Sequence, residues 1–355
     1  PAPPPDEEPS PPRNSPGGTT PGAIGGVAIP TYRVEVPLLA ALPEQFRQGN
    51  LAMVGNLHQR VGDDGVMGAS SSAAAPGQQN HRQAWARLIR TDRTIGQAGT
   101  ASPTSEGHLT GIQTGTDLWA DPNWRVGVYA AQLEGPQRVN AFARGLPGLA
   151  VGSNELRSQF LGAYATWKND SGLYVVGVLQ GGRHRYTAST TLGSASSGKG
   201  HSLLASIEAG KAFRLSPEWT LEPQLQLVHQ RISLDDAGIV GAIVQQDSHS
   251  GWVVRAGVRV KGDLTTAAGP LQPYARLNLY RSSNGTDVTR FIGPSGSTDI
   301  ATRTGGTSTE LAAGATLQLT PAMSVYGEVG KLWASGGDAR IKSGINASVG
   351  VKFSW

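Results

Sequence analysis

The sequence predicts an all-β fold: a twelve-stranded antiparallel transmembrane β-barrel that follows one N-terminal α-helix. Apolar and polar residues alternate with a period of two from Arg82 to Trp355, as they do along strands with two different faces. The connections between these strands are short and long in turn, which is typical of an up-and-down barrel with two different ends. A single stretch with helical character precedes them, and the pattern predicts no second helix after it.

Composition excludes several other classes of protein. The chain has 355 residues, of which 48 are Gly, 23 are Pro and none is Cys, and only 16% of them are charged. The absence of Cys excludes a disulfide-stapled fold. There is no run of 18 apolar residues, so the sequence predicts no transmembrane helix. The net charge of +4 comes from scattered arginines, and we therefore expect no nucleic-acid partner.

Three domains are expected along the chain. Residues 1–30 are rich in Pro, Gly, Ser and Thr and hold too little apolar surface to fold, which predicts a linker that is extended where proline dominates. Residues 31–81 hold the helix and, from Asp63, a small and polar connector. Residues 82–355 form the barrel.

The helix is predicted in the segment EVPLLAALPEQFRQGNLAMVGNLHQRVG, Glu35–Gly62. Pro43 suits a first helical position and Glu44 places a negative charge in the first turn. Gly62 stands where a left-handed cap would end the helix. One continuous helix from Pro43 to Val61 would be about 28 Å long. Its apolar stripe is weak and consists of Phe46, Asn50, Met53, Val54, Leu57 and Val61.

Twelve segments alternate as strands do. The last is the clearest, because Val349, Val351, Phe353 and Trp355 share one face while Lys352 lies on the other. The predicted segments are 84–94, 107–119, 123–133, 155–167, 172–186, 200–213, 219–231, 250–261, 271–281, 307–319, 322–333 and 344–355. The segment at 172–186 is apolar on both faces, so its sides stay unassigned.

The connections differ in length at the two ends of the predicted sheet. Short runs of turn residues follow every second segment, for example DPN at 121–123, KNDS at 168–171 and TPA at 320–322. The other connections are mostly longer and rich in Gly and Ser, such as Gln132–Asn154 and Ser282–Gly306. We expect these longer runs to be surface loops.

Three β architectures are compared with this pattern. A soluble sandwich would place many Lys and Glu outside, and a lipocalin-like barrel has only eight strands. A transmembrane barrel faces lipid with its apolar residues and fills its interior with polar and small ones. About nine to eleven tilted residues cross the hydrocarbon core, which suits the predicted segments. An even number of strands also closes the sheet without free edges, so the transmembrane barrel is favoured.

The polar faces of the strands would then line the lumen. Ten charged residues are expected there: Arg87, Asp117, Glu208, Glu222, Arg255, Arg259, Arg276, Glu310, Glu328 and Lys352. We consider two roles for them, structural ion pairs in a wet channel and contacts to the polar face of the helix.

Tryptophans near the strand ends suit an aromatic girdle at the membrane interfaces. They stand at positions 85, 119, 124, 167, 219 and 355. Trp85 is two residues from Arg87, and Trp119 is two residues from Asp117, so the members of each pair should share one face of a strand. A girdle position for the tryptophan and a lumen position for the charged residue therefore conflict.

Motifs for catalysis and metal binding are weak. The seven histidines are spread over the chain, and no two have the spacing of metal ligands. Asp63–Asp64 precedes a glycine, which is an ordinary turn sequence. The run LGSASSGKG at Leu192–Gly200 has no helix after it and so does not predict a phosphate-binding loop. We expect no metal, no cofactor and no enzymatic activity, and an outer-membrane hydrolase is disfavoured for the same reasons.

Five stretches carry a resemblance to a known family. They are Tyr32–Asp64, RQAWAR at Arg82–Arg87, LEPQLQL at Leu221–Leu227, LQPYARLN at Leu271–Asn278 and the terminal VKFSW. Each alone is weak, but the ordered set resembles the C-terminal translocator domains of autotransporters, in the pertactin-like group of type V secretion proteins. The resemblance extends over most of the chain from residue 31.

The resemblance implies a twelve-stranded barrel in the outer membrane of a Gram-negative bacterium, with the helix running through its pore. Such a domain mediates secretion of its own N-terminal passenger, anchors it at the cell surface, and is then plugged by the helix. The residues expected to form the plug are Phe46, Arg47, Asn50, Met53, Asn56, Leu57 and Arg60. In a wet lumen we expect the helix to make polar contacts all round.

The expected partners are the lipid bilayer, the passenger and the barrel-assembly machinery. In proteins of this family the machinery reads the final strand, here Val349, Val351, Phe353 and Trp355. We expect a monomer, with the linker at 1–30 toward the cell surface. Transport through the barrel's own pore and transport through a hybrid with the machinery would look identical in the sequence.

Two alternative functions remain. One is a passive, porin-like channel, which needs an open lumen. The other is self-cleavage, because some family members cut the passenger inside the pore with an asparagine of the helix. Asn50 stands in a Gly-Asn-Leu context rather than in the paired asparagines of such members, which disfavours self-cleavage here.

Overall fold

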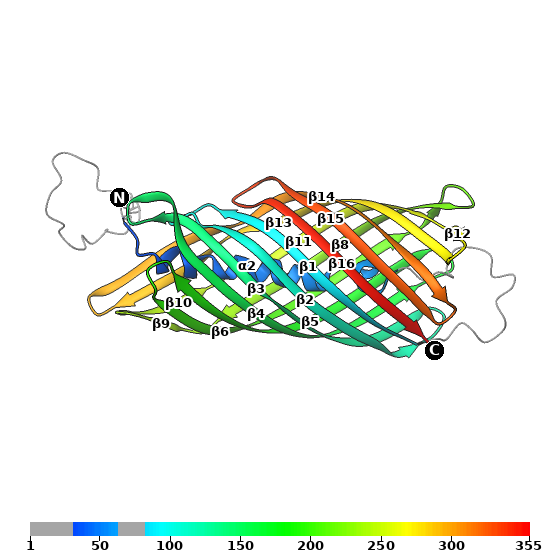
Figure 1. Cartoon of the computed structure of the whole chain (residues 1–355), viewed down its shortest axis with the longest axis horizontal. Helices are drawn as coiled ribbons and strands as arrows, with labels where there is room; N and C mark the ends of the chain where they lie inside the picture. The colour runs from blue at the N-terminus through cyan, green and yellow to red at the C-terminus, as the bar shows by residue number, and fades with distance from the viewer. Residues whose placement is uncertain (1–30, 63–81) are drawn as a thin grey trace, which may run out of the picture. The chain divides into compact units, whose positions relative to one another are not determined.

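The computed structural model describes residues 31–62 and 82–355. The predicted linker at 1–30 and the predicted connector at 63–81, including Asp63 and Asp64, lie outside the described residues. Thr31–Trp355 form one compact unit, which is a barrel with helix in its interior (Figure 1).

Within the described residues, twelve long antiparallel strands close into the predicted barrel. Neighbours in the chain pair in order, and the last strand pairs with the first, from Gln83 opposite Ser354 to Gln97 opposite Ala339. The strands are β1 (Gln83–Gln97), β2 (Thr104–Ala120), β3 (Trp124–Ala143), β4 (Leu146–Lys168), β5 (Leu173–Thr190), β6 (Ala195–Lys211), β8 (Trp219–Leu234), β11 (Gly251–Gly262), β13 (Gly269–Gly293), β14 (Gly296–Thr320), β15 (Met323–Gly337) and β16 (Ala339–Ser354).

Short strands decorate the two ends of the barrel. They are β7 (Phe213–Arg214), β9 (Ala237–Ile239), β10 (Ala242–Asp247) and β12 (Leu264–Thr266). β9 and β10 extend the end with the long connections, which we name the hairpin end, whereas β7 and β12 lie in the short connections of the opposite end, the turn end.

The helix inside the barrel differs in detail from the predicted one. It begins before Pro43, where the continuous helix was predicted to start, and it is divided into α1 (Glu35–Ala40), α2 (Leu42–Val54) and α3 (Leu57–Val61). Gly55 has a φ of 50° and interrupts it, because only glycine adopts such a backbone readily. Asn56 then caps α3 with its side chain, in a capping box with Gln59. No helix of the described residues is long and apolar enough to cross a membrane.

The two predicted longest loops are strand in the structure. The β3–β4 ladder continues to Ala143 opposite Leu146, and the β13–β14 ladder continues to Gly293 opposite Gly296. Gln132–Asn154 and Ser282–Gly306 are therefore mostly paired hairpins that extend the barrel wall. Their Gly and Ser content suggested loops, but the ladder tolerates these residues because each strand is paired along its length.

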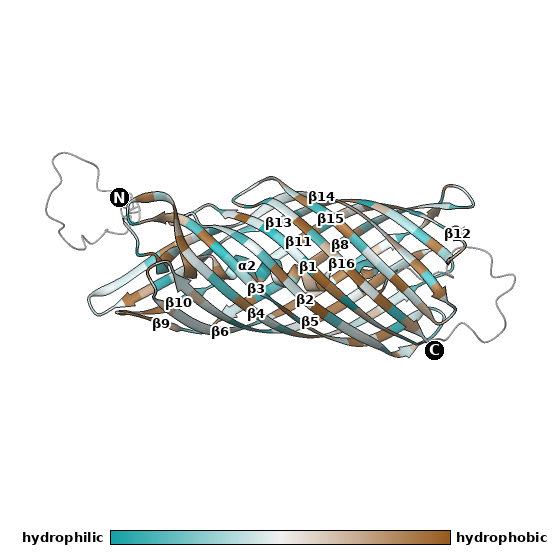
Figure 2. Ribbon diagram, viewed as in Figure 1, coloured by the Kyte–Doolittle hydropathy of each residue, from teal (hydrophilic) through white to brown (hydrophobic). Residues whose placement is uncertain are grey.

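Hydrophobic and hydrophilic residues alternate along the strands (Figure 2). Over much of the wall the apolar side chains are exposed outside and the polar ones are buried inside, as predicted. On β8, Leu225 is 57% exposed, whereas the neighbouring Gln226 is 6% exposed. The face of the segment at 172–186 is also settled, because Tyr174, Val176 and Val178 are buried inside.

Leu225→Arg is expected to lower the free energy of unfolding by about 2–4 kcal/mol, because it places a cation on the lipid face. Urea-induced unfolding in lipid vesicles measures this loss. Leu225→Phe keeps an apolar side chain at the same position and should change stability by about 0.5 kcal/mol or less. Equal losses for the two variants would contradict the assignment of this face to lipid.

One tryptophan assignment was wrong. Trp85 is 2% exposed and lies inside the barrel, on the same face as Arg87. Trp119 is 48% exposed although Asp117 is buried, because the β2–β3 register shifts between these two residues. Such a bulge inserts one extra residue, so the residues beyond it point to the opposite face of the sheet. The two-residue spacing of Asp117 and Trp119 in the sequence does not reveal the bulge.

Candidate functional site: the interface between helix and barrel

At the hairpin end the helix is surrounded by apolar side chains. Leu38, Leu39 and Leu42 are fully buried there. We name this region the apolar collar, and its main residues are Val34, Val36, Leu38, Leu39, Leu42, Phe46, Val139, Val151, Leu156, Tyr186, Ile232, Leu234, Val244, Phe291 and Ile300. The expectation of polar contacts all round the helix was therefore wrong for this half. Several collar residues, such as Val139 and Phe291, lie in runs that were expected to be loops.

Polar side chains of the wall fix the helix within the collar. Asn154 Nδ2 donates to the carbonyl of Leu38 and to Oε1 of Gln45, both at 2.9 Å. Arg47 donates to both carboxylate oxygens of Asp287, at 2.7 and 2.5 Å. The two side chains are 7% and 1% exposed, so this bidentate pair is shielded from water. Sequence reasoning missed Asn154 and Asp287, because both lie in the runs that were read as loops.

Wall residues also cap the break in the helix. The interruption at Gly55 leaves carbonyl groups without helical partners. Arg87 donates to the carbonyls of Met53, at 3.0 Å, and of Gln59, at 2.8 Å. Gln226 Nε2 donates to the carbonyl of Gly55 at 3.0 Å. The wall thus provides partners for an irregular backbone in the middle of the lumen.

Acidic residues of the wall meet α3. The backbone N–H of Leu57 donates to Glu208 at 3.2 Å, which places a carboxylate at the start of this helix. Glu222 Oε1 lies 2.8 Å from Nε2 of His58, and Gln59 Nε2 donates to Glu328 at 2.8 Å. These wall carboxylates contact the helix directly.

The helix ends near Tyr326 of β15. Its hydroxyl donates to the carbonyl of Arg60 at 2.6 Å. The Arg60 side chain is buried, donates to the carbonyl of Val54 at 3.2 Å, and lies 5.7 Å from the centre of the Tyr164 ring. The contacts of the helix therefore continue from the hairpin end almost to the turn end.

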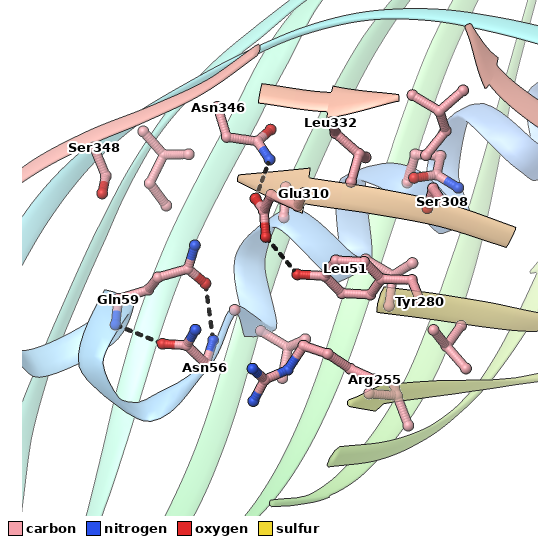
Figure 3. Close-up of a pocket in the computed structure, with 18 of the residues that line it drawn as sticks. Leu51, Asn56, Gln59, Arg255, Tyr280, Ser308, Glu310, Leu332, Asn346 and Ser348 are labelled. Carbon is pink, nitrogen blue, oxygen red and sulfur yellow. Dashed lines mark hydrogen bonds between the residues drawn. The ribbon is translucent and has the colours of Figure 1, made fainter. Parts of the chain in front are cut away.

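A network of buried charges occupies the wall beside α2 and α3. Arg276 donates to both oxygens of Glu328, at 2.6 and 2.9 Å, and lies 3.2 Å from Glu310. Tyr280 donates to Glu310 at 2.7 Å and Asn346 donates to it at 3.2 Å. Figure 3 shows Glu310 between these two side chains. Each carboxylate oxygen of Glu310 and Glu328 thus has a donor within the protein.

A cavity of about 100 Å³ lies between part of this network and the helix, beside the direct contact of Gln59 with Glu328, and both polar and apolar side chains line it. Leu51, Asn56 and Gln59 line it from the helix, and Glu310 and Arg255 line it from the wall (Figure 3). A volume of this size holds about three water molecules. The lumen is therefore dry in the collar and leaves room for water beside the second half of the helix.

The remaining charged residues predicted for the lumen also point inward. Arg255, Arg259 and Lys352 are 2%, 0% and 3% exposed, and Asp117 is paired with Arg125 at 2.9 Å. The structure thus places all ten predicted residues on the inner face, and it brings Arg87, Glu208, Glu222 and Glu328 to the helix itself, whereas Arg276 and Glu310 pair within the wall.

The residues predicted for the plug lie at this interface. Phe46, Arg47, Asn50, Met53, Asn56 and Arg60 are buried, and Leu57 is half-buried. The four residues predicted for the assembly signal lie on the outer face of β16, where Val349, Phe353 and Trp355 are 57%, 44% and 58% exposed and Val351 is half-buried. No cluster of His, Cys, Asp and Glu among the described residues could hold a metal ion.

Comparisons with known proteins agree with this architecture. The family model described as autotransporter beta-domain matches residues 84–330. The pertactin autotransporter of Bordetella bronchiseptica is 27% identical over 227 residues, which are 61% of this chain and 23% of that protein. The BrkA autotransporter of Bordetella pertussis is 30% identical over 192 residues, 52% of this chain and 18% of that protein. The chain thus spans about a fifth of the length of these relatives.

Solved structures share the fold. The transport unit of the autotransporter AIDA-I from Escherichia coli matches with a TM-score of 0.65 and 17% identity, and the match covers 92% of this chain and all of that one. The translocator domain of NalP from Neisseria meningitidis matches with a TM-score of 0.62 and 13% identity over 88% of this chain and 96% of that one. Because the family model matches well over half of the 355 residues, this chain belongs to the autotransporter β-domain family and is a translocator domain of the Gram-negative outer membrane.

Proposed function

We propose that this domain mediates the export of a passenger that precedes residue 1 and afterwards anchors it, with the helix closing the pore. The observation that carries the proposal is the helix itself, which contacts the barrel wall from Asn154 at the hairpin end to Tyr326 near the turn end. A chain that has passed through a pore leaves its last segment inside, and this helix connects whatever precedes it to the first strand.

The direction of the helix sets the orientation. Its N-terminal end lies at the hairpin end, where the backbone N–H of Arg144 donates to the carbonyl of Tyr32. In transmembrane barrels the longer connections face the cell exterior and the short turns face the periplasm. Here the longer connections are the β3–β4 and β13–β14 hairpins, which extend the wall at the hairpin end. The hairpin end is therefore the outer end, and residues 1–30 lead toward the cell surface.

The partners follow from the same arrangement. The exposed apolar face contacts the lipid bilayer, and the passenger continues from the N-terminal side. The outward row of β16, which ends at Phe353 and Trp355, is available for the barrel-assembly machinery. The single closed barrel with its own helix supports a monomer.

The proposal includes no enzymatic activity. Self-cleavage would use an asparagine of the helix, but Asn50 lies within α2, and its nearest polar partners are the Gln230 amide and the Ser202 hydroxyl, both at 3.4 Å. Asn56 is engaged in capping α3. Among the described residues neither asparagine is hydrogen-bonded to a carboxylate, and this supports cleavage, where it occurs, by a separate protease.

Removal of Phe353 and Trp355 side chains tests the proposed assembly signal and export together. An epitope fused before residue 1 should be digested by protease added to whole cells that express the wild-type barrel. Phe353→Ala/Trp355→Ala should lower the folded barrel in the outer membrane and the surface epitope in proportion. Phe213→Ala/Trp219→Ala removes two aromatic residues of the same end from other strands and is the matched control. Equal surface display by both double variants would contradict the signal, and a wild-type epitope that stays inaccessible would contradict export.

A further inference from the structure

The outer surface of the barrel carries a group of cations that export does not use. We name Arg157, Arg183, Arg185, Lys199 and Arg231 the basic patch. They lie on the neighbouring strands β4, β5, β6 and β8, and all five side chains are exposed. The residues between them in sequence, such as His184, are buried inside the barrel, so the patch belongs entirely to the outer face.

The strand register brings like charges together. Arg157 lies directly opposite Arg185, and Arg185 lies directly opposite Lys199 on its other side. In the next row toward the turn end, Arg183 lies opposite His201. Like charges that face each other across a sheet destabilise it. The facing cations Arg185 and Lys199 are therefore more stable with an anion bound across them.

The protein itself supplies negative charge only at the two ends of this row, where Glu134 lies opposite Arg157 and Asp235 lies beside Lys199. Glu134 forms an ion pair with Arg157 at 2.8 Å. Within residues 31–62 and 82–355, no carboxylate forms an ion pair with Arg183, Arg185, Lys199 or Arg231. Some exposed arginines elsewhere are paired on their own surface, as Arg290 is with Asp299 at 2.7 Å.

An apolar surface begins directly beside the patch. The row next to Arg183 contains Leu161, Gly181 and Leu203, which face one another across β4, β5 and β6, and on β8 the same row ends at Arg231 of the patch. Leu161 and Leu203 are 69% and 58% exposed. A Cβ atom on Gly181 would meet only the Leu161 carbonyl, at 3.9 Å. The glycine therefore leaves an open, shallow recess between two leucines.

The position of the patch along the barrel matches the edge of the membrane. β5 begins at Leu173 at the turn end, and Arg183 is ten residues further along. At about 3.3 Å per residue and a tilt of about 40°, this stretch rises about 25 Å, which is the height of the apolar band of such barrels. The basic patch therefore lies at the level of the lipid headgroups on the hairpin side.

We propose that the basic patch binds the phosphate groups of lipopolysaccharide in the outer leaflet, while acyl chains of the same molecule lie along Leu161, Gly181 and Leu203. Arginine pairs bind phosphate through two parallel N–H donors, and the apolar recess begins where the headgroup ends. This site goes beyond export, and it rests on the proposed function only for the orientation that places the hairpin end outside.

The test uses the whole chain, purified in dodecyl maltoside and titrated with deep-rough lipopolysaccharide, whose headgroup carries mainly the lipid phosphates. Saturation should raise the midpoint of thermal unfolding of the wild type by about 5 °C or more. R183Q/R185Q/K199Q should lower the apparent affinity at least about tenfold, since each lost phosphate contact weakens binding. R281Q/R303Q/K331Q removes three exposed cations from β13, β14 and β15 and should bind as the wild type does.

Three further arms identify the occupant. Dephosphorylated lipopolysaccharide and inorganic phosphate alone should each leave the midpoint within about 1 °C of its starting value. Gly181→Leu keeps the charge and should weaken binding of the intact lipid by filling the recess. Equal binding of lipopolysaccharide by the two triple variants would overturn the proposal. So would a rise of the unfolding midpoint by about 5 °C with dephosphorylated lipopolysaccharide or with inorganic phosphate alone. Unchanged binding by Gly181→Leu would overturn the placement of the acyl chains. Surface display of the epitope, measured on the same variants in cells, should persist, so that failure of export is seen separately from failure of lipid binding.

Discussion

Arg276→Met is expected to lower the free energy of unfolding by about 3–5 kcal/mol, which is the usual cost of removing one partner from a buried ion pair. Arg276 is 2% exposed and pairs with Glu310 and Glu328, which are themselves buried. Without the cation, the two carboxylates face each other in a site with little water. Urea-induced unfolding in lipid vesicles, followed by tryptophan fluorescence, measures the loss.

Two variants complete this experiment. Arg90→Met removes an exposed arginine, 54% accessible, whose partner Asp92 is also exposed, and it should cost about 1 kcal/mol or less. Adding Glu310→Gln and Glu328→Gln to Arg276→Met removes the uncompensated charges and should recover part of the loss. Equal stabilities of Arg276→Met and Arg90→Met would show that the network is not a stabilising feature of the wall.

Leu39→Asn/Leu42→Asn is expected to open the pore to ions. Both leucines are fully buried in the apolar collar, and a dry apolar constriction excludes water and ions. Each asparagine would place an amide without partners among apolar side chains and remove packing volume, at a cost of about 2–5 kcal/mol per site. Conductance of the purified protein in planar bilayers should rise several-fold.

A third leucine of the same helix is the matched control. Leu51 lines the cavity beside the helix, where polar side chains such as Asn56 and Glu310 can be partners for an amide. Leu51→Asn should therefore leave conductance close to that of the wild type. If Leu51→Asn and the collar variant conduct equally, the seal is not in the collar but is distributed along the helix.

Much of the wall could be predicted from the sequence. Period-two alternation is a local signal, so the twelve strands and the inward positions of residues such as Arg87 and Glu310 were accessible, and short Pro- and Asn-containing turns marked one end. The strands were predicted too short at the other end. There, glycine and serine obscured the alternation, and the pairing of β13 with β14 depends on contacts with the neighbouring strand that no local pattern contains.

The helix interface was harder to predict, for two physical reasons. The break at Gly55 is stable because Arg87 and Gln226 donate to its free carbonyls, and those donors are 32 and 171 residues away in the chain. Part of the apolar collar is formed by the inner face of hairpins that were predicted to be loops. A wet lumen was therefore assumed along the whole helix, although Val139 and Phe291 make its outer half dry.

The conductance of a plug deletion tests the central claim most directly. Wild-type protein and a variant without residues 38–60 would be purified, inserted in planar bilayers and compared at the same voltage. The deletion removes the helix from the collar to Arg60 and leaves all twelve strands in place. Plugging predicts small currents for the wild type and stable, large single-channel currents for the deletion variant. Equal currents for the two proteins would contradict the conclusion that the helix closes this pore.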